Sequence, residues 1–198
     1  YGARRAATLI VAVNCGRSGG TCFCTSMGTG PKAEAGYDLS LTELPETCGG
    51  CFVVDVGSEA GAEIVEKMNL SEAAPADIAA AEARIADAAD SMQRHMIPDA
   101  EAVMKRNLEN SYWDKIAERC LNCANCTMAC PTCFCTTVED TTDLTGEHAE
   151  RWRKWDSCFT LDFSYIHGGG LRRSGGARYR QWMTHKLAHW HDQFGTSG

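Results

Sequence analysis

Four closely spaced cysteines followed by a proline constrain this 198-residue chain more than any other feature. Cys120, Cys123, Cys126 and Cys130 are separated by two, two and three residues, and Pro131 follows directly. Gaps of two residues let one tight loop direct three thiolates toward a common centre, and small residues between them leave backbone N–H groups free to point at the sulfurs. We therefore predict that this loop binds a metal centre through its thiolates.

The spacing also separates iron–sulfur from zinc. Zinc sites commonly use two Cys-x-x-Cys pairs joined by a longer loop, whereas C-x₂-C-x₂-C-x₃-C-P is the bacterial ferredoxin run, whose fourth cysteine ligates the other cluster in two-cluster proteins. We expect Cys120, Cys123 and Cys126 to share one [4Fe–4S] cluster and Cys130 to serve a second. A zinc-binding structural or nucleic-acid-binding module is the alternative, and it would be colourless.

Further cysteines extend the candidate metal site. Two cubanes need eight ligands, but residues 120–158 supply only seven cysteines. Either the ligand set is unusual or a partner motif follows Gly198, and we expect the latter, which makes this chain a fragment. The predicted metal ligands beyond the run are Cys133, Cys135, Cys158, Cys15, Cys22 and Cys24.

The N-terminal cysteines lie in a loop rich in glycine. The sequence Thr-Cys-Phe-Cys-Thr occurs at 21–25 and again at 132–136, so both copies are candidates for similar metal-binding loops. Gly19 and Gly20 would allow the backbone to approach a bulky cofactor closely. Buried reduced thiols are the alternative for this loop. Cys48 and Cys51 form a Cys-x-x-Cys pair whose role, as ligands, as a redox-active pair or as an adventitious pair, stays open.

Composition indicates the compartment in which the protein works. Twelve cysteines without a basic and apolar leader favour metal sites in a reducing compartment over disulfides, so we expect a cytoplasmic protein. No apolar run approaches the roughly 20 residues that a membrane span needs.

Charge is unevenly distributed along the chain. Residues 1–150 carry 11 basic and 23 acidic side chains, a net charge of −12, and residues 151–198 carry 8 basic and 3 acidic side chains, a net charge of +5. The basic end would suit an acidic partner or offset the charge of thiolate-bound clusters. Its arginines form no continuous run, so we expect no nucleic acid partner.

The pattern along the chain predicts an α+β protein. We expect a β-rich region at 1–60 containing the Cys15/Cys22/Cys24 loop, a helical region at 61–118, and a ferredoxin-type [4Fe–4S] region at 119–198 that is incomplete at its C-terminus. The expected strands lie at 8–14, 38–44 and 52–56, and the expected helices at 61–68, 77–96, 100–119 and 177–190. Residues 139–150 are expected to form an acidic loop. The histidines at 185, 189 and 191 are expected on a solvated helix face rather than in a zinc site.

Motifs beyond the cysteine run carry a resemblance to a known family. They are Trp155-Asp-Ser-Cys158, His167-Gly-Gly-Gly170 and Arg178-Tyr-Arg-Gln-Trp-Met-Thr-His-Lys186, with Val13-Asn-Cys15, Gly19-Gly-Thr-Cys-Phe-Cys24 and Met27-Gly-Thr-Gly-Pro31 near the N-terminus. With them the chain resembles the iron–sulfur β subunit of sulfhydrogenases and, equally, the corresponding iron–sulfur subunit of anaerobic sulfite reductase. Members of that family continue into a second ferredoxin run and carry a further cysteine upstream of the position of Tyr1.

The resemblance implies an electron-transfer subunit with no catalytic residues of its own. Such a protein relays electrons between a subunit that binds flavin and NAD(P)H and a catalytic subunit, either a hydrogenase or a sulfite or sulfur reductase. Whether the chain is itself an enzyme stays open. In the alternative interpretation Cys133, Cys135 and Cys158 bind a cluster that reduces a substrate directly.

Overall fold

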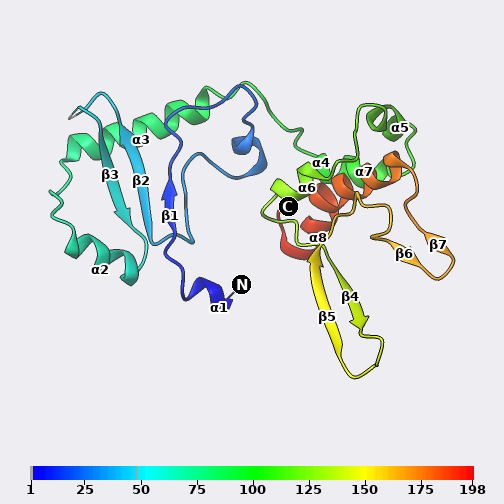
Figure 1. The fold of residues 1–198 in the computed structure, drawn as a ribbon. Helices are drawn as coiled ribbons and strands as arrows, with labels where there is room; N and C mark the ends of the chain where they lie inside the picture. The colour runs from blue at the N-terminus through cyan, green and yellow to red at the C-terminus, as the bar shows by residue number, and fades with distance from the viewer. Residues whose placement is uncertain (1, 48) are drawn as a thin grey trace. The chain divides into compact units, whose positions relative to one another are not determined.

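The chain forms two compact units, residues 1–98 and residues 99–198. The computed structural model describes residues 2–47 and 49–198, so the open question of Cys48 lies outside the described residues. The predicted α+β class is confirmed by the mixture of helices and strands in Figure 1. The boundary between the two units falls inside the segment 61–118, which was expected to be one helical region. The division of the chain into three regions stays a prediction. No helix among the described residues is both long and apolar enough to cross a membrane.

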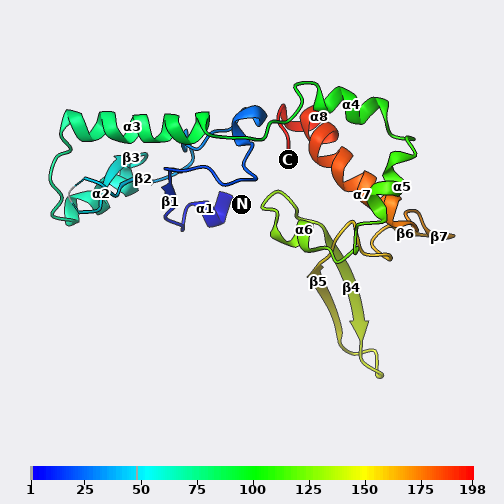
Figure 2. The same ribbon diagram turned by 90° about the horizontal axis from the view of Figure 1, so that it is seen from above.

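The first unit is built on a three-stranded sheet in the order β1-β2-β3. Strand β1 (Val11–Val13) pairs parallel to β2 (Leu39–Leu44), and β2 pairs antiparallel to β3 (Cys51–Val56). These strands fall within or next to the three predicted segments. The helices of this unit are α1 (Gly2–Arg5), the 3₁₀ helix η1 (Cys24–Met27), α2 (Glu59–Lys67) and α3 (Pro75–Asp90). Helix α3 runs along one face of the sheet (Figure 2) and buries Ala81 and Ala88.

A buried aspartate joins three elements of the first unit. Asp38, which is only 3% exposed, accepts hydrogen bonds from the Ile10 N–H (2.7 Å), the Ser58 hydroxyl (2.6 Å) and Arg5 Nη2 (3.0 Å). The same Ser58 oxygen accepts from the Gly61 N–H and so caps α2. The hydrogen bond from Arg5, followed by those from Ser58 and Ile10, holds the pKa of the Asp38 carboxyl well below its usual range.

The predicted helix 100–119 is wrong, because the chain forms two helices there. They are α4 (Ala100–Arg106) and α5 (Tyr112–Ala117). Asn107 ends α4, and its amide nitrogen donates to the Val103 carbonyl (2.9 Å) while its own carbonyl accepts from Trp113 Nε1 (2.8 Å). Asparagine side chains that bond the local backbone compete with helix continuation in this way.

The second unit surrounds one long helical element. Helix α7 (Gly175–Thr184) continues through a π-helical turn η2 (His185–His189) into α8 (Trp190–Phe194), so the predicted helix 177–190 is present but longer. The short helix α6 (Asn125–Ala129) and the two-stranded ribbons complete the unit; the ribbons pair β4 (Thr136–Thr142) with β5 (Ala149–Trp155), and β6 (Tyr165–Ile166) with β7 (Gly169–Gly170). Phe159, Tyr179 and Trp182 pack edge to face, with ring centroids 5.4–6.0 Å apart.

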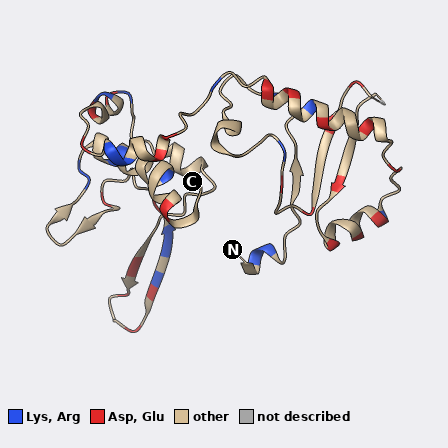
Figure 3. Ribbon diagram, turned by 180° about the vertical axis from the view of Figure 1, so that it is seen from behind, with Lys and Arg blue, Asp and Glu red and all other residues tan. Residues whose placement is uncertain are grey.

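The predicted acidic loop 139–150 is also wrong. Most of it belongs to the β4–β5 hairpin, with a turn between the strands. Figure 3 shows acidic residues along β4 facing basic residues along β5, and the cross-strand pairs are Arg151–Asp140 (2.6 Å) and Lys154–Glu139. Threonine, valine and tryptophan lie between the charged residues and favour a strand, and the opposite charges pair across the hairpin. These preferences outweigh the acidic composition that suggested a loop.

A chain of hydroxyl groups fixes the loop after β5 onto α6. The Phe159 N–H donates to Ser157 Oγ (3.1 Å), the two hydroxyl oxygens of Ser157 and Thr127 lie 2.7 Å apart, and Thr127 donates to the Ala124 carbonyl (2.7 Å). Each hydroxyl has one proton, so Ser157 donates to Thr127. Because both residues are buried, this chain holds the backbone beside Cys126 and the backbone beside Cys158 in fixed positions.

We predict that Asp38→Asn lowers the stability of the first unit in a pH-dependent way. The carboxyl pKa is depressed on folding, so the stabilisation is fully present above the unfolded value of about 4 and is lost as the pH falls through the lower folded value. Urea unfolding followed by circular dichroism should give a wild-type advantage at neutral pH that shrinks below about pH 4. The exposed Asp87→Asn is the control, and an equal effect of both substitutions would contradict the prediction.

We predict that Thr127→Val destabilises the second unit by about 1–3 kcal/mol, because the buried Ser157 hydroxyl loses its acceptor. The substitution preserves shape, so little cavity is created. Chemical unfolding under anaerobic conditions measures the change, with the exposed hairpin variant Thr141→Val as a control that should stay within a few tenths of wild type. Equal stability of Thr127→Val and wild type would show that the hydroxyl chain does not support the unit.

Candidate metal centre

The loop Cys120–Cys126 adopts a backbone shape that suits an anion. Asn122 and Ala124 have positive φ values of 51° and 62°, which non-glycine residues adopt rarely. The turn at Asn122 brings its N–H to within 3.4 Å of Cys120 Sγ. Successive N–H groups in such left-handed turns form concave sites that bind anions, including iron–sulfur clusters. The backbone conformation of this loop therefore suits a negatively charged ligand.

The three thiols of this loop influence one another. Burial raises the pKa of the Cys126 thiol, and the charges of Cys120 and Cys123 add to that rise. Burial likewise raises the pKa of Tyr179 on α7, with further contributions from Cys120 and Cys126. The three thiols therefore lie close enough for their charges to interact, and those of Cys120 and Cys126 also act on Tyr179 of α7.

The N-terminus of α7 approaches the same loop. Gly175 lies so close to the Asn122 amide that a Cβ added there would be 3.0 Å from its nitrogen, and a Cβ on Gly176 would be 3.0 Å from Asp114 Oδ1. The Ser174 hydroxyl accepts from the Ala177 N–H and caps the helix. The positive end of the helix dipole therefore faces the loop and favours negative charge in it.

A second thiol group lies beside a buried lysine. Thr132 Oγ1 is 3.1 Å from Cys130 Sγ and accepts a hydrogen bond from Lys186 Nζ (2.6 Å). Burial raises the pKa of the Cys130 thiol, but the hydrogen bonds from Thr132 and the charge of Lys186 outweigh burial and lower it. For Cys133 burial prevails over Lys186, and its pKa is raised.

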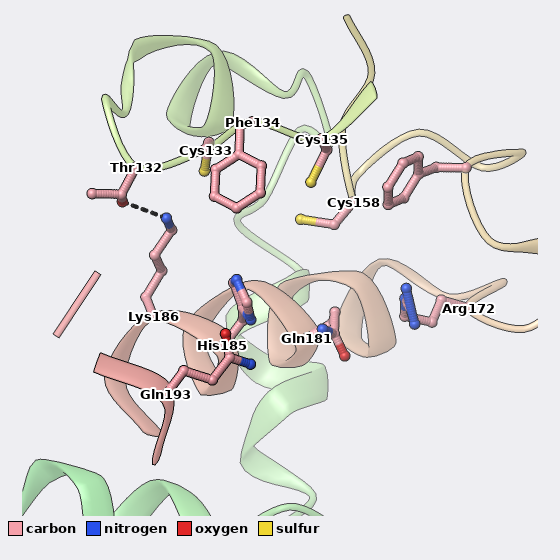
Figure 4. Close-up of a pocket in the computed structure, with 11 residues that line it drawn as sticks. Thr132, Cys133, Phe134, Cys135, Cys158, Arg172, Gln181, His185, Lys186 and Gln193 are labelled. Atoms are coloured by element: carbon pink, nitrogen blue, oxygen red, sulfur yellow. Dashed lines mark hydrogen bonds between the residues drawn. The ribbon is translucent and has the colours of Figure 1, made fainter. Parts of the chain in front are cut away.

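A cavity of about 420 Å³ connects Cys133 with two further cysteines. Figure 4 shows the thiols of Cys135 and Cys158 pointing toward one another, with Lys186 reaching Thr132 at the other end. Burial, followed by the neighbouring thiols of Cys135, Cys133 and Cys126, raises the pKa of Cys158 to about 12. A thiol of this kind releases its proton when a cation binds, so metal binding and ionisation are coupled here.

Buried donors around this region have no acceptor among the described residues. They are Arg172 Nε, which belongs to a residue lining the cavity, and Arg178 Nε and Trp182 Nε1 on or beside the long helix. Buried N–H groups are normally satisfied, and the sulfides and thiolates of an iron–sulfur cluster are acceptors. The orphaned donors, the thiols and Lys186 therefore fit a negatively charged cluster. Among the residues that the structure describes, no group of three metal-binding side chains lies close enough to hold a single ion.

The predicted N-terminal ligands are less closely associated. The Gly19 N–H points at Cys22 Sγ (3.2 Å), Cys24 Sγ lies 3.7 Å from Met92 Sδ, and Cys15 is exposed. Cys51 Sγ lies 3.5 Å from the Thr47 carbonyl oxygen. Nothing in the first unit brings Cys15, Cys22 and Cys24 to a shared cavity among those described, and their role as ligands stays a prediction.

The expectation of a solvated histidine face is wrong. His185 is half-buried and lines the cavity, and its ring lies 6.3 Å from that of His189 and 5.6 Å from that of Trp190. Burial lowers the pKa of His185, and the charge of Lys186 adds to the effect. Lys186, Thr132 and Arg172 were also missed, because residues this far apart in sequence carry no spacing signal.

Comparisons with known proteins show similarity to iron–sulfur proteins. Residues 119–198 match the family model described as a 4Fe-4S dicluster domain. The chain is 33% identical over 172 residues to sulfhydrogenase 2 subunit beta of Pyrococcus furiosus; the match covers 85% of this chain and 49% of that protein, so the chain spans about half the length of this relative. No solved structure matches the chain significantly. The chain is thus similar to an iron–sulfur sulfhydrogenase β subunit over most of its own length, and its residues 119–198 match a 4Fe-4S dicluster domain.

Proposed function

We propose that the protein relays electrons between a subunit that binds flavin and NAD(P)H and a catalytic redox subunit. The observation that carries this proposal is the adjacency of thiol groups in the second unit. The thiols of Cys135, Cys133 and Cys126 all lie close enough to Cys158 to raise its pKa. Clusters bound to neighbouring thiols would be close enough for electrons to pass between them. The named relative is a subunit of a sulfhydrogenase, which supports a place in a redox complex.

The proposed ligands follow from the thiol groups and the motif. Cys120, Cys123 and Cys126 hold one [4Fe–4S] cluster, and Cys130 contributes to a second. Cys133, Cys135 and Cys158 are ligands at the cavity, and Cys15, Cys22 and Cys24 are ligands in the first unit. When bound, such clusters accept and release one electron at a time, which is the chemistry that a relay requires.

The remaining residues of the site would tune this chemistry. Phe134, which lines the cavity, packs edge to face against Trp190 with ring centroids 6.2 Å apart and adds an apolar wall beside the thiols. The N-terminus of α7 and the ammonium of Lys186 supply positive charge near the thiols. Burial, hydrogen bonds to sulfur and net charge are the means by which proteins set cluster potentials.

The cavity supports a second candidate function, in which a cluster at Cys133, Cys135 and Cys158 reduces a substrate directly. Three thiolates leave one iron position open, and Arg172 and Lys186 would attract a small anion. Addition of sulfite to the reduced protein separates the two functions. A changed EPR spectrum with oxidation of the protein favours the reductase, and an unchanged spectrum favours the relay.

We predict that Cys126→Ala removes one cluster signal from the EPR spectrum of the dithionite-reduced protein and lowers the iron and acid-labile sulfide content in proportion. The reason is that a cubane rarely survives the loss of a thiolate from its tight loop. Met128→Ala is the matched control, because Met128 lies on the same helix α6 and is 59% exposed. An unchanged spectrum for Cys126→Ala would refute the ligand assignment.

We predict that Cys158→Ala affects a different signal from the one that Cys126→Ala removes. Cys158 faces Cys135 across the cavity, whereas Cys126 belongs to the loop beside α7. Spectra of the two single variants and the double variant, recorded at the same protein concentration, test this. Loss of the same signal in both single variants would place Cys126 and Cys158 on one cluster.

A further inference from the structure

Lys186 is a lysine in an unusual position. Its residue is only 5% exposed, its ammonium donates to Thr132 Oγ1 at 2.6 Å, and the same nitrogen lies 4.9 Å from the centre of the Trp190 ring. Lysine is rarely buried to this extent unless its charge is paired. Both contacts are made by the ammonium nitrogen, so they fix the position of the charge.

Among the described residues, the charge of Lys186 has no carboxylate partner. No ion pair within 4.0 Å involves Lys186 in that part of the chain, whereas Lys105 and Lys154 in the same unit both have acidic partners. An isolated buried ammonium is strongly unfavourable unless an opposite charge compensates it. The ionisable groups on the facing loop are the thiols of Cys130 and Cys133.

The helix geometry directs this side chain inward. In the π-helical turn η2 the three consecutive residues Lys186, Leu187 and Ala188 are all buried. A regular α-helix with one face toward solvent does not bury three residues in a row, because each residue turns the side chain by about 100°. π-Turns are frequent at functional sites, and here the turn carries the lysine onto the cysteine side of the helix (Figure 4).

We propose that Lys186 is the fixed counter-charge of the cluster bound through Cys130 and Cys133, and that it raises the reduction potential of this cluster above that of the cluster bound through Cys120, Cys123 and Cys126. This inference rests on the proposed electron-transfer function. Reduction would add one electron and one negative charge to the cluster, and a positive charge at Lys186 would stabilise it. The electron therefore moves toward the Cys130 side of the unit, and Lys186 sets the direction of the relay as a positioning charge that takes no part in bond making.

The experiment is an anaerobic EPR-monitored redox titration of wild type, Lys186→Gln and Lys186→Arg. We expect Lys186→Gln to disfavour reduction of one cluster by about tenfold, a fall in potential of about 59 mV for one electron, while the other signals keep their potentials. Lys186→Arg keeps the charge and should stay near wild type. Lys154→Gln removes a charge from the exposed hairpin and is the matched control, because solvent and salt screen that position.

The outcomes separate this inference from the function on which it rests. Wild type without iron and acid-labile sulfide overturns the proposed function itself. Full cluster content with no shift in Lys186→Gln, or a shift equal to that of Lys154→Gln, overturns the role of Lys186 and leaves the electron-transfer function standing. If Lys186→Gln loses the cluster, Lys186→Met replaces it, because methionine is apolar and of similar length and suits this buried position without charge; a lowered potential then supports the inference, and an unchanged one overturns it.

Discussion

Concentrating seven cysteines in one unit creates a charge problem that the rest of that unit has to solve. Each metal-bound thiolate carries negative charge, and like charges in a partly dehydrated site repel strongly. Residues 151–198 carry a net charge of +5, which offsets part of this negative charge. Two of their cationic side chains, Arg172 and Lys186, line the thiol-bearing cavity, and the N-terminus of α7 adds a further positive pole near the Cys120 loop.

Placing the thiols depends on a few buried hydroxyl groups. The Ser157–Thr127 hydrogen bond lies one residue from Cys158 on one side and one residue from Cys126 on the other. A hydroxyl chain suits this position because it connects two backbones with directional bonds without introducing charge of its own. The aromatic cluster around Phe159 then packs the same loop onto α7. Polar bonds thus set the geometry, and apolar packing supplies the stabilisation.

The sequence was most informative where local spacing determines structure. The three strands of the first unit follow from patterns within a few residues, and the structure contains them. The assignment of Cys120, Cys123 and Cys126 to one cluster follows from local spacing in the same way and stays a prediction. The prediction of a single helix over 100–119 was wrong because Asn107 ends the first helix. Its side-chain amide donates to the Val103 carbonyl, and its backbone carbonyl accepts from Trp113 Nε1. Lys186 and Thr132 are 54 residues apart, so only the tertiary fold brings them together. The π-turn that buries Lys186 likewise leaves no periodic signal, because it interrupts the period.

Several elements of the second unit are too short to be stable on their own. Helices α4, α5 and α6 contain seven, six and five residues, well below the roughly 12–15 residues at which isolated helices become marginal. The β4–β5 hairpin is exposed along most of both strands and contributes little to a core. Clusters bound as proposed would add to the stabilisation that apolar packing gives this unit, since metal binding to thiolates contributes folding free energy. If the cysteines of the second unit bind the proposed clusters, cluster assembly and folding of residues 99–198 are one coupled process, and the ligands of the relay also stabilise the fold.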